Sequence, residues 1–348
     1  MKRFLEFAWP LIGVAAVVAA LFLLHQQFQG EAVFSKLWAD FRALPPYRLV
    51  LAVVATLVAY AALAWYDRIA LLHLGIKHIS WTFIALCSFT TYALAHNIGA
   101  SVLSGAVVRY RAYTSKGLNP GQIAILVALC SLTFGLGVLL LGGLILICEP
   151  QQLHRLSGLL PNVMTNPTTA RTLGAICLGV VACYVIGSIF KLKPFQLGRF
   201  RVEYPRPGIA IRQLLASSME LIGAAGIIYF ALPEQGNPGF IAVLAVFIAS
   251  FSAALASNAP GGLGVFELLF IKAMPAMAPV KVLTALLVFR MLYLILPLAF
   301  AVLVIIVFER RKLAEAIHHT EPGAVSAGTE TKAQDLRKGK GGNAAGVS

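Results

Sequence analysis

Charged residues are scarce in this sequence. They make up 12% of its 348 residues, whereas an average soluble domain carries about 25%. Hydrophobic residues make up 59%, and this composition excludes an ordinary soluble domain. Several apolar runs approach the ~20 residues that an α-helix needs to cross a bilayer. Because backbone groups in hydrocarbon must bond within the protein, we expect an all-α polytopic membrane protein.

The sequence also lacks the motifs of common enzyme and cofactor sites. It contains no HExxH, no GxSxG and no Walker-type phosphate loop. Its five cysteines lie in or at the ends of apolar runs, without CxxC spacing or histidine partners at metal spacing. Gly99, Ala100 and Ser101 follow soon after His96, but Val102 replaces the glycine that a serine hydrolase motif would need. We expect no enzymatic activity, no metal and no cofactor.

Positive charge is in excess, with a net charge of +14. The basic residues lie in short loops between apolar runs, which is typical of membrane topology and of contact with anionic lipid headgroups. A nucleic-acid partner would require a basic soluble domain, and the sequence has none. The basic loop 191–212 is expected on the anionic inner leaflet, or acts only as a topology determinant.

Six apolar runs predict full membrane spans: 7–24, 49–66, 123–148, 172–190, 210–232 and 281–307. Two further segments are broken, 81–108 by HNIGAS and 240–279 by SNAPGGLGVFE. We expect each of them to form a re-entrant hairpin, which gives eight apolar segments in total. The loose likeness of NIGASV (97–102) and NAPGGLGV (258–265) is compatible with an inverted repeat.

The distribution of Lys and Arg favours this topology only slightly. Among the Lys and Arg that flank the apolar segments up to residue 312, 16 lie inside and 7 outside if both termini are cytoplasmic, whereas a single crossing by 81–108 gives 15 and 8 in the opposite orientation. Lys2 and Arg3 before the first span favour the first arrangement. We expect an integral membrane domain over 1–312, with an interfacial helix at 31–44, and a polar, disordered cytoplasmic tail over 313–348.

Polar residues inside the apolar segments mark candidate functional sites, because each costs about 2.5–3.5 kcal/mol at the centre of a membrane helix. We expect Arg290 to pair with either Glu267 or Glu220 in low dielectric. Such a pair could simply lock helices together. It could also line a polar cavity that accepts a lipid headgroup, and the two interpretations are compatible.

The glycine-rich breaks supply a second feature. Non-helical backbone at membrane depth is tolerated where it is buried in protein or lines a cavity. After APGG the chain can restart as a short helix whose free N–H groups suit a phosphate. The alternative for both glycine clusters is close helix packing through small residues.

Three motifs carry a family resemblance. They are NIGASVLSGAVVRYRAYTSKGL (97–118), PGGLGVFE (260–267), and Arg290 with Tyr293 and Pro297. Together they resemble the membrane domain of lysylphosphatidylglycerol synthetase/flippase proteins, over residues 5–312. The likeness is closest to stand-alone inner-membrane members, since the polar tail leaves no room for the aminoacyltransferase domain.

This resemblance implies a flippase that moves a phospholipid or lipid-linked species between leaflets of a bacterial inner membrane. A non-transporting scaffold or regulator of a lipid-modifying or envelope-biogenesis enzyme is the main alternative, and a transporter of small solutes or ions comes third. In the first case membrane lipid is the substrate, and a lipid-synthesis enzyme could be a partner. The predicted headgroup path comprises Asn97, Ser101, Arg109, Arg111, Glu220, Asn258, Gly261, Gly262, Gly264, Glu267, Arg290 and Tyr293.

Overall fold

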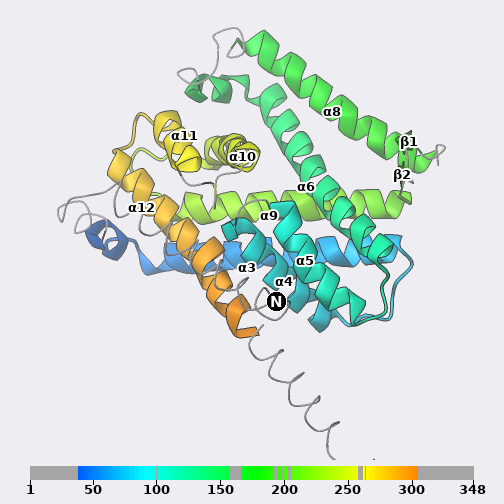
Figure 1. Ribbon diagram of the computed structural model, residues 1–348. Coiled ribbons are helices and arrows are strands. Elements are labelled where there is room, and N and C mark those ends of the chain that lie inside the picture. The colour runs from blue at the N-terminus through cyan, green and yellow to red at the C-terminus, as the bar shows by residue number, and fades with distance from the viewer. Residues whose placement is uncertain are drawn as a thin grey trace, which may run out of the picture. The chain divides into compact units, whose positions relative to one another are not determined.

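The computed structural model describes residues 38–98, 101–156, 166–190, 195–197, 200–202, 205–257, 262 and 264–304. These residues are predominantly helical (Figure 1). The chain divides into two compact units, Met1–Val302 and Leu303–Ser348, and all contacts discussed below lie within the first. The predicted span 7–24 and the predicted domain boundary at 312 fall outside the described residues.

Five helices of the described part are long and apolar enough to cross a membrane. They are α3 (Pro46–His73), α6 (Pro120–Cys148), α8 (Pro167–Ile189), α9 (Pro207–Ala231) and Pro279–Val304, which contains α12 (Pro279–Arg290) and the π-helix η3 (Met291–Ile295). Each begins with a proline, whose fixed φ suits the first turn and whose missing N–H has no helical partner there. The predicted all-α, multi-pass fold is confirmed, and five of the six predicted spans coincide with these helices.

Helices α3 and α9 lie side by side and run antiparallel (Figure 1). A Cβ added at Gly223 of α9 would lie 2.9 Å from the carbonyl oxygen of Ala55 and 3.1 Å from the Cβ of Ala59. At one end of the pair, the guanidinium of Arg48 donates to the carbonyl of Leu232 at 2.8 Å. Small residues thus let the two backbones approach closely, as is common between membrane helices.

Helix α9 also contacts α6, α10 and α12, and α8 packs against α6. The amide of Gln213 in α9 donates to the hydroxyl of Thr133 in α6 at 2.9 Å. Between α6 and α8, a Cβ added at Gly174 would lie 2.8 Å from the carbonyl oxygen of Gly143. Much of α8 faces outward, with Ile176 59% exposed, as expected for a helix surface against lipid.

The two broken segments form helix pairs. Helix α4 (Trp81–Ile98) is followed by α5 (Ser101–Thr114), and α10 (Phe240–Ala256) by α11 (Val265–Ala273). A Cβ at Gly105 would lie 3.1 Å from Thr91 and 3.7 Å from Ala95, so α5 folds back on α4. The ring of Phe266 lies against Phe247 and Phe251 in the same way. The hairpins are confirmed, while their return to one membrane face stays a prediction.

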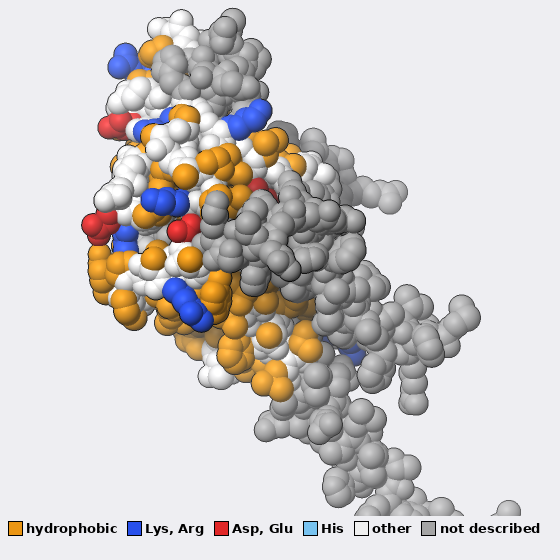
Figure 2. Space-filling model, turned by 90° about the vertical axis from the view of Figure 1, so that its left-hand side faces the viewer, with side chains coloured by type: hydrophobic (Ala, Val, Ile, Leu, Met, Phe, Trp, Pro, Cys, Tyr) orange, Lys and Arg blue, Asp and Glu red, His pale blue; other side chains and the backbone are white. Residues whose placement is uncertain are grey.

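The smaller elements lie between the long helices. A 3₁₀ turn, η1 (Pro150–Leu156), follows α6. The basic loop contains an antiparallel ribbon of β1 (Phe195–Leu197) and β2 (Phe200–Val202), which the all-α expectation did not include. Residues 38–42 are mainly helical, within the predicted interfacial helix. Apolar side chains are widespread over the face in Figure 2, with charged groups scattered among them.

We predict that Gly223→Ala lowers the stability of the protein, because its methyl group would press on the α3 backbone. Overpacking of this kind typically costs about 1–3 kcal/mol. The measurement is thermal unfolding of the purified protein in detergent. Gly179→Ala is the matched control, since a Cβ at Gly179 of α8 meets nothing within 4 Å. Equal unfolding midpoints for the two variants would contradict the close α3–α9 contact.

Candidate functional site

The centre of the candidate site is a buried ion pair between the second hairpin and α12. The guanidinium Nε of Arg290 donates to Glu267 Oε1 at 2.7 Å, and both side chains are buried. Of the two acidic partners that the sequence allowed for Arg290, the structure shows Glu267. Two charges at membrane depth are tolerable when each offsets the other and hydrogen bonds satisfy the rest.

Glu267 also caps the helix that carries it. Helix α11 begins at Val265, so Glu267 lies in its first turn, and its Oε2 accepts the N–H of Gly264 at 2.8 Å. A carboxylate there is favoured by the positive end of the helix dipole. The same carboxylate therefore satisfies both a helix N-terminus and an arginine.

Glycines make the preceding turn feasible. Gly262 has φ +65° and Gly264 has φ +82°, conformations that L side chains rarely adopt. A Cβ at Gly262 would also lie 2.8 Å from the Cβ of Ala254, so the turn packs tightly on the end of α10. The predicted site residues Asn258 and Gly261 lie outside the described residues.

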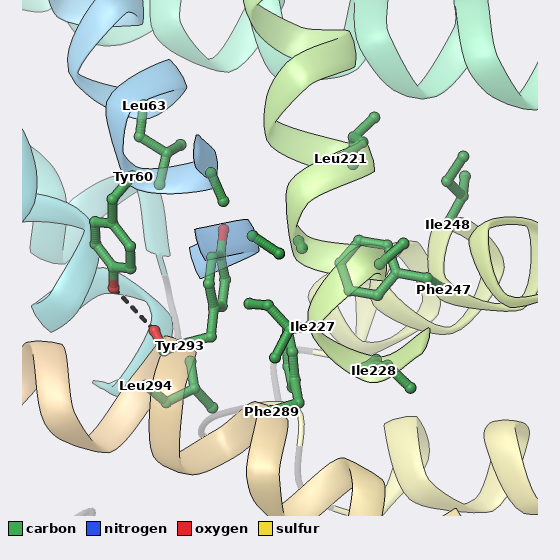
Figure 3. Close-up of a cluster of buried hydrophobic side chains, with 14 of the residues drawn as sticks. Tyr60, Leu63, Leu221, Ile227, Ile228, Phe247, Ile248, Phe289, Tyr293 and Leu294 are labelled. Carbon is green, nitrogen blue, oxygen red and sulfur yellow. Dashed lines mark hydrogen bonds between the residues drawn. The ribbon is translucent and has the colours of Figure 1, made fainter. Parts of the chain in front are cut away.

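The helix after Arg290 widens into the π-helix η3, where the N–H of Leu296 bonds to the carbonyl of Met291. Pro297 has no N–H, so the carbonyl of Tyr293 lacks the donor that an α-helix would supply. The hydroxyl of Tyr60 in α3 donates to that carbonyl at 2.9 Å (Figure 3). Widened turns of this kind occur frequently at functional sites.

Asn97 binds the neighbouring carbonyl of the same turn. Its amide donates to Leu294 at 3.1 Å and to Ala93 of its own helix at 2.7 Å. Asn97 therefore ties the end of α4 to η3. The ring of His96, one residue earlier, stacks on Tyr293 with centroids 5.2 Å apart and meets Phe251 of α10 edge-on at 6.0 Å. Both hairpins thus approach one another beside Tyr293.

Tyr293 also binds the second predicted acid. Its hydroxyl donates to Glu220 Oε1 at 2.8 Å, and both residues are completely or almost completely buried. Glu220 comes from the middle of α9, and Tyr66 of α3 lies beside the same carboxyl group. In Figure 3, Tyr293 reaches up from the α12 segment into the space between α3 and α9.

A second buried ion pair lies at the open end of the first hairpin. Arg109 of α5 donates through Nη2 to Asp67 Oδ1 at 2.6 Å and through Nε to Oδ2 at 3.2 Å. Tyr113 and Cys130 donate to the same carboxylate at 2.9 and 3.4 Å. The Arg109 guanidinium also lies 4.9 Å from the centroid of Tyr92. This pair is fully enclosed, so Arg109 faces Asp67 and aromatic rings.

Sequence reasoning missed Asp67. The predicted span ended at residue 66, which placed Asp67 in a flank, whereas α3 continues to His73 and buries it. Reading the apolar run on past Asp67 through IALLHL would have revealed an acid inside the helix. Its pairing with Arg109 would still have required the α4–α5 hairpin.

The structure thus gathers only part of the predicted set. Around the ion pair and Tyr293 it brings together Asn97, Glu220, Gly262, Gly264, Glu267, Arg290 and Tyr293. It places Arg109 in the separate pair with Asp67 and leaves Arg111 exposed. Ser101 begins α5, and its side chain lies outside the described part. Within the described residues, no group of three or more His, Cys, Asp or Glu side chains could hold a metal ion.

We predict that Arg109→Met strongly destabilises the protein, because it leaves Asp67 buried without its cation. Breaking a buried pair on one side costs about 3–5 kcal/mol. Arg111→Met is the control two residues away, where exposed charges contribute at most about 1 kcal/mol. Unfolding midpoints in detergent compare the two. An Arg109→Met variant as stable as Arg111→Met would show that the enclosed pair is not a structural element.

Comparison with known proteins places the chain in a family. No family model matches it. An uncharacterized protein of Synechocystis sp., slr0712, is 31% identical over 304 residues, which span 86% of this chain and 92% of that protein. The Escherichia coli inner membrane protein YbhN is 28% identical over 298 residues, 84% of this chain and 89% of YbhN. Because the match to slr0712 extends over most of both chains, this chain belongs to the same protein family as slr0712.

Proposed function

We propose that the chain is a lipid translocase, and not an enzyme, that moves a phospholipid or lipid-linked species between the leaflets of a bacterial inner membrane. Both termini would lie on the cytoplasmic side. The multi-pass fold supports this proposal, as does the similarity to a relative named as an inner membrane protein. The resemblance of three motifs to the lysylphosphatidylglycerol flippase domain supports the choice of a lipid as substrate.

The observation that carries the proposal is the double role of Glu267. Its carboxylate accepts from Arg290 and from the Gly264 N–H at the start of α11. A guanidinium and a helix N-terminus are the groups that proteins use to bind phosphate. Glu267 therefore occupies the place that an anionic headgroup would take.

An exchange of partners follows from this arrangement. When a headgroup phosphate enters, it would compete with Glu267 for Arg290 and for the α11 N-terminus. Glu267 would then be free to move, and with it the second hairpin. A site that can hold either the internal carboxylate or the headgroup has two states, as transport between two faces requires.

The proposed headgroup site includes fewer residues than the predicted headgroup path. Arg109 is already paired with Asp67, so the proposed headgroup site relies on Arg290 as its cation. Asn97 and Tyr293 border that site, since they hold the widened turn directly after Arg290. In this proposal the first hairpin lines the headgroup site on the side that faces the second hairpin.

We predict that the double variant Glu267→Gln/Arg290→Met folds but does not move lipid. The introduced glutamine retains an acceptor for the Gly264 N–H, and the introduced methionine fills the volume of the arginine stem. Removing both charges of a buried pair is often neutral for stability, whereas removing one costs about 3–5 kcal/mol. The double variant thus distinguishes an ion pair that binds the headgroup from one that only stabilises the fold.

Transport is measured in vesicles of phosphatidylethanolamine and phosphatidylglycerol that contain fluorescently labelled phosphatidylglycerol, by chemical quenching of the outer leaflet. Glu149→Gln, at the half-buried residue that follows α6, is the control and should behave as wild type. A double variant that is stable and still moves the label would show that the ion pair stabilises the fold and does not bind the headgroup. Wild-type protein that moves no label would favour the scaffold alternative.

A further inference from the structure

Glu220 differs from the other buried acids in its surroundings. Its Oε1 accepts from Tyr293, and its Oε2 is buried with no cation beside it among the described ion pairs. The hydroxyl of Tyr66 is likewise buried, and it lies beside this carboxyl group and interacts with it. Burying an ionised carboxylate without a paired cation is costly, so the fold retains an acid here at a loss of stability.

The groups that face Glu220 are phenols. They come from the elements packed on α9: Tyr60 and Tyr66 from α3, and Tyr293 from η3. Helix α10 carries no titratable residue. Cys130 of α6 donates to Asp67, and Tyr184 of α8 donates to Gln213.

The three buried arginines of the described part have other partners, and Arg48 donates to the carbonyl of Leu232. Arg290 pairs with Glu267, and Arg109 pairs with Asp67. A carboxylate at membrane depth with only phenols around it is costly to keep charged, whereas the protonated acid carries no charge and gains an O–H donor. Uptake of a proton at Oε2 therefore removes the uncompensated charge of this carboxyl group.

The position of Glu220 links that proton to the headgroup site. Tyr293, which holds Oε1, lies three residues after Arg290 and in the widened turn that follows it. The same tyrosine stacks on His96, a half-buried titratable side chain whose buried Nδ1 has no partner in the described part. A change of charge at Glu220 acts on Tyr293 directly, and through η3 on the helix that presents Arg290.

We infer that Glu220 is a proton-binding site that couples lipid movement to the movement of a proton. The proton would bind at Oε2 from water on one face and leave to water on the other, so only an O–H bond forms and breaks. The inference rests on the proposed translocase function. It supplies an energy source for a chain whose sequence contains no nucleotide-binding loop.

The test uses the full chain in the phosphatidylethanolamine and phosphatidylglycerol vesicles described above. A pH difference of one unit is imposed, and potassium with valinomycin clamps the membrane potential at zero. With one proton per lipid, such a gradient sustains a ratio of roughly ten between the labelled lipid in the two leaflets. Wild type and Glu149→Gln should approach this ratio, and Glu220→Gln should stay near one.

A second measurement reads the proton itself. Infrared difference spectra between two pH values should show the carbonyl stretch of a protonated carboxylic acid in the wild type. Glu220→Gln should lose that band, and Glu149→Gln should keep it. Unfolding midpoints confirm that the Glu220→Gln variant is folded.

The outcomes separate the two proposals. If wild type moves the label and the pH gradient has no effect on its distribution, proton coupling is overturned and the proposed translocase function stands. A carboxylic acid band that persists in Glu220→Gln overturns the proton site. A wild type that moves no label under any gradient overturns the translocase function, and the coupling with it.

Discussion

In hydrocarbon no water is present to satisfy a polar group, and the arrangement around Tyr293 follows from that constraint. Pro297 removes a helical donor from the Tyr293 carbonyl, and the hydroxyl of Tyr60 replaces it. Asn97 does the same for the next carbonyl, while the Tyr293 hydroxyl serves Glu220. Each bond joins a different helix to the α12 segment, so one irregular turn fixes the positions of α3, α4 and α9 around it.

The same constraint explains the two ion pairs. Asp67 with Arg109, and Glu267 with Arg290, are each enclosed and hydrogen-bonded. They differ in what else contacts the charges. Asp67 accepts from a tyrosine and a cysteine as well as its arginine. Both oxygens of its carboxylate therefore have hydrogen-bond donors within the protein. Glu267 instead holds the N-terminus of a nine-residue helix next to two glycines with positive φ, so its position depends on the conformation of that turn.

The order of elements repeats along the chain. A long helix, a hairpin of two shorter helices and another long helix occur once as α3, α4–α5 and α6, and again as α9, α10–α11 and α12. The first long helices of the two sets pack antiparallel through glycine and alanine. The hairpins meet beside Tyr293, where His96 contacts Phe251. This arrangement is compatible with the inverted repeat that the sequence suggested, and it brings Asn97 near the end of α4 and Glu267 at the start of α11 to the same segment, α12 and η3.

The sequence by itself determined the membrane class, the five spans of the described residues and both hairpins. Apolar runs of the right length leave a helix no alternative in lipid, and glycines in the middle of such a run weaken the helix. It also singled out Glu267, Arg290 and Glu220, because a charged residue inside an apolar run is conspicuous whatever surrounds it. The predicted helix ends were less accurate, which is why Asp67 was missed.

Only the tertiary structure decided which charges meet. Sequence spacing left Arg290 with two possible acids, and the turn at Gly262 and Gly264 brings Glu267 to it. The same packing encloses Arg109 with Asp67 and leaves Glu220 among phenols. Pairing across helices depends on their relative rotation and depth. These are set by contacts such as Gly223 against Ala55, between residues far apart in the chain.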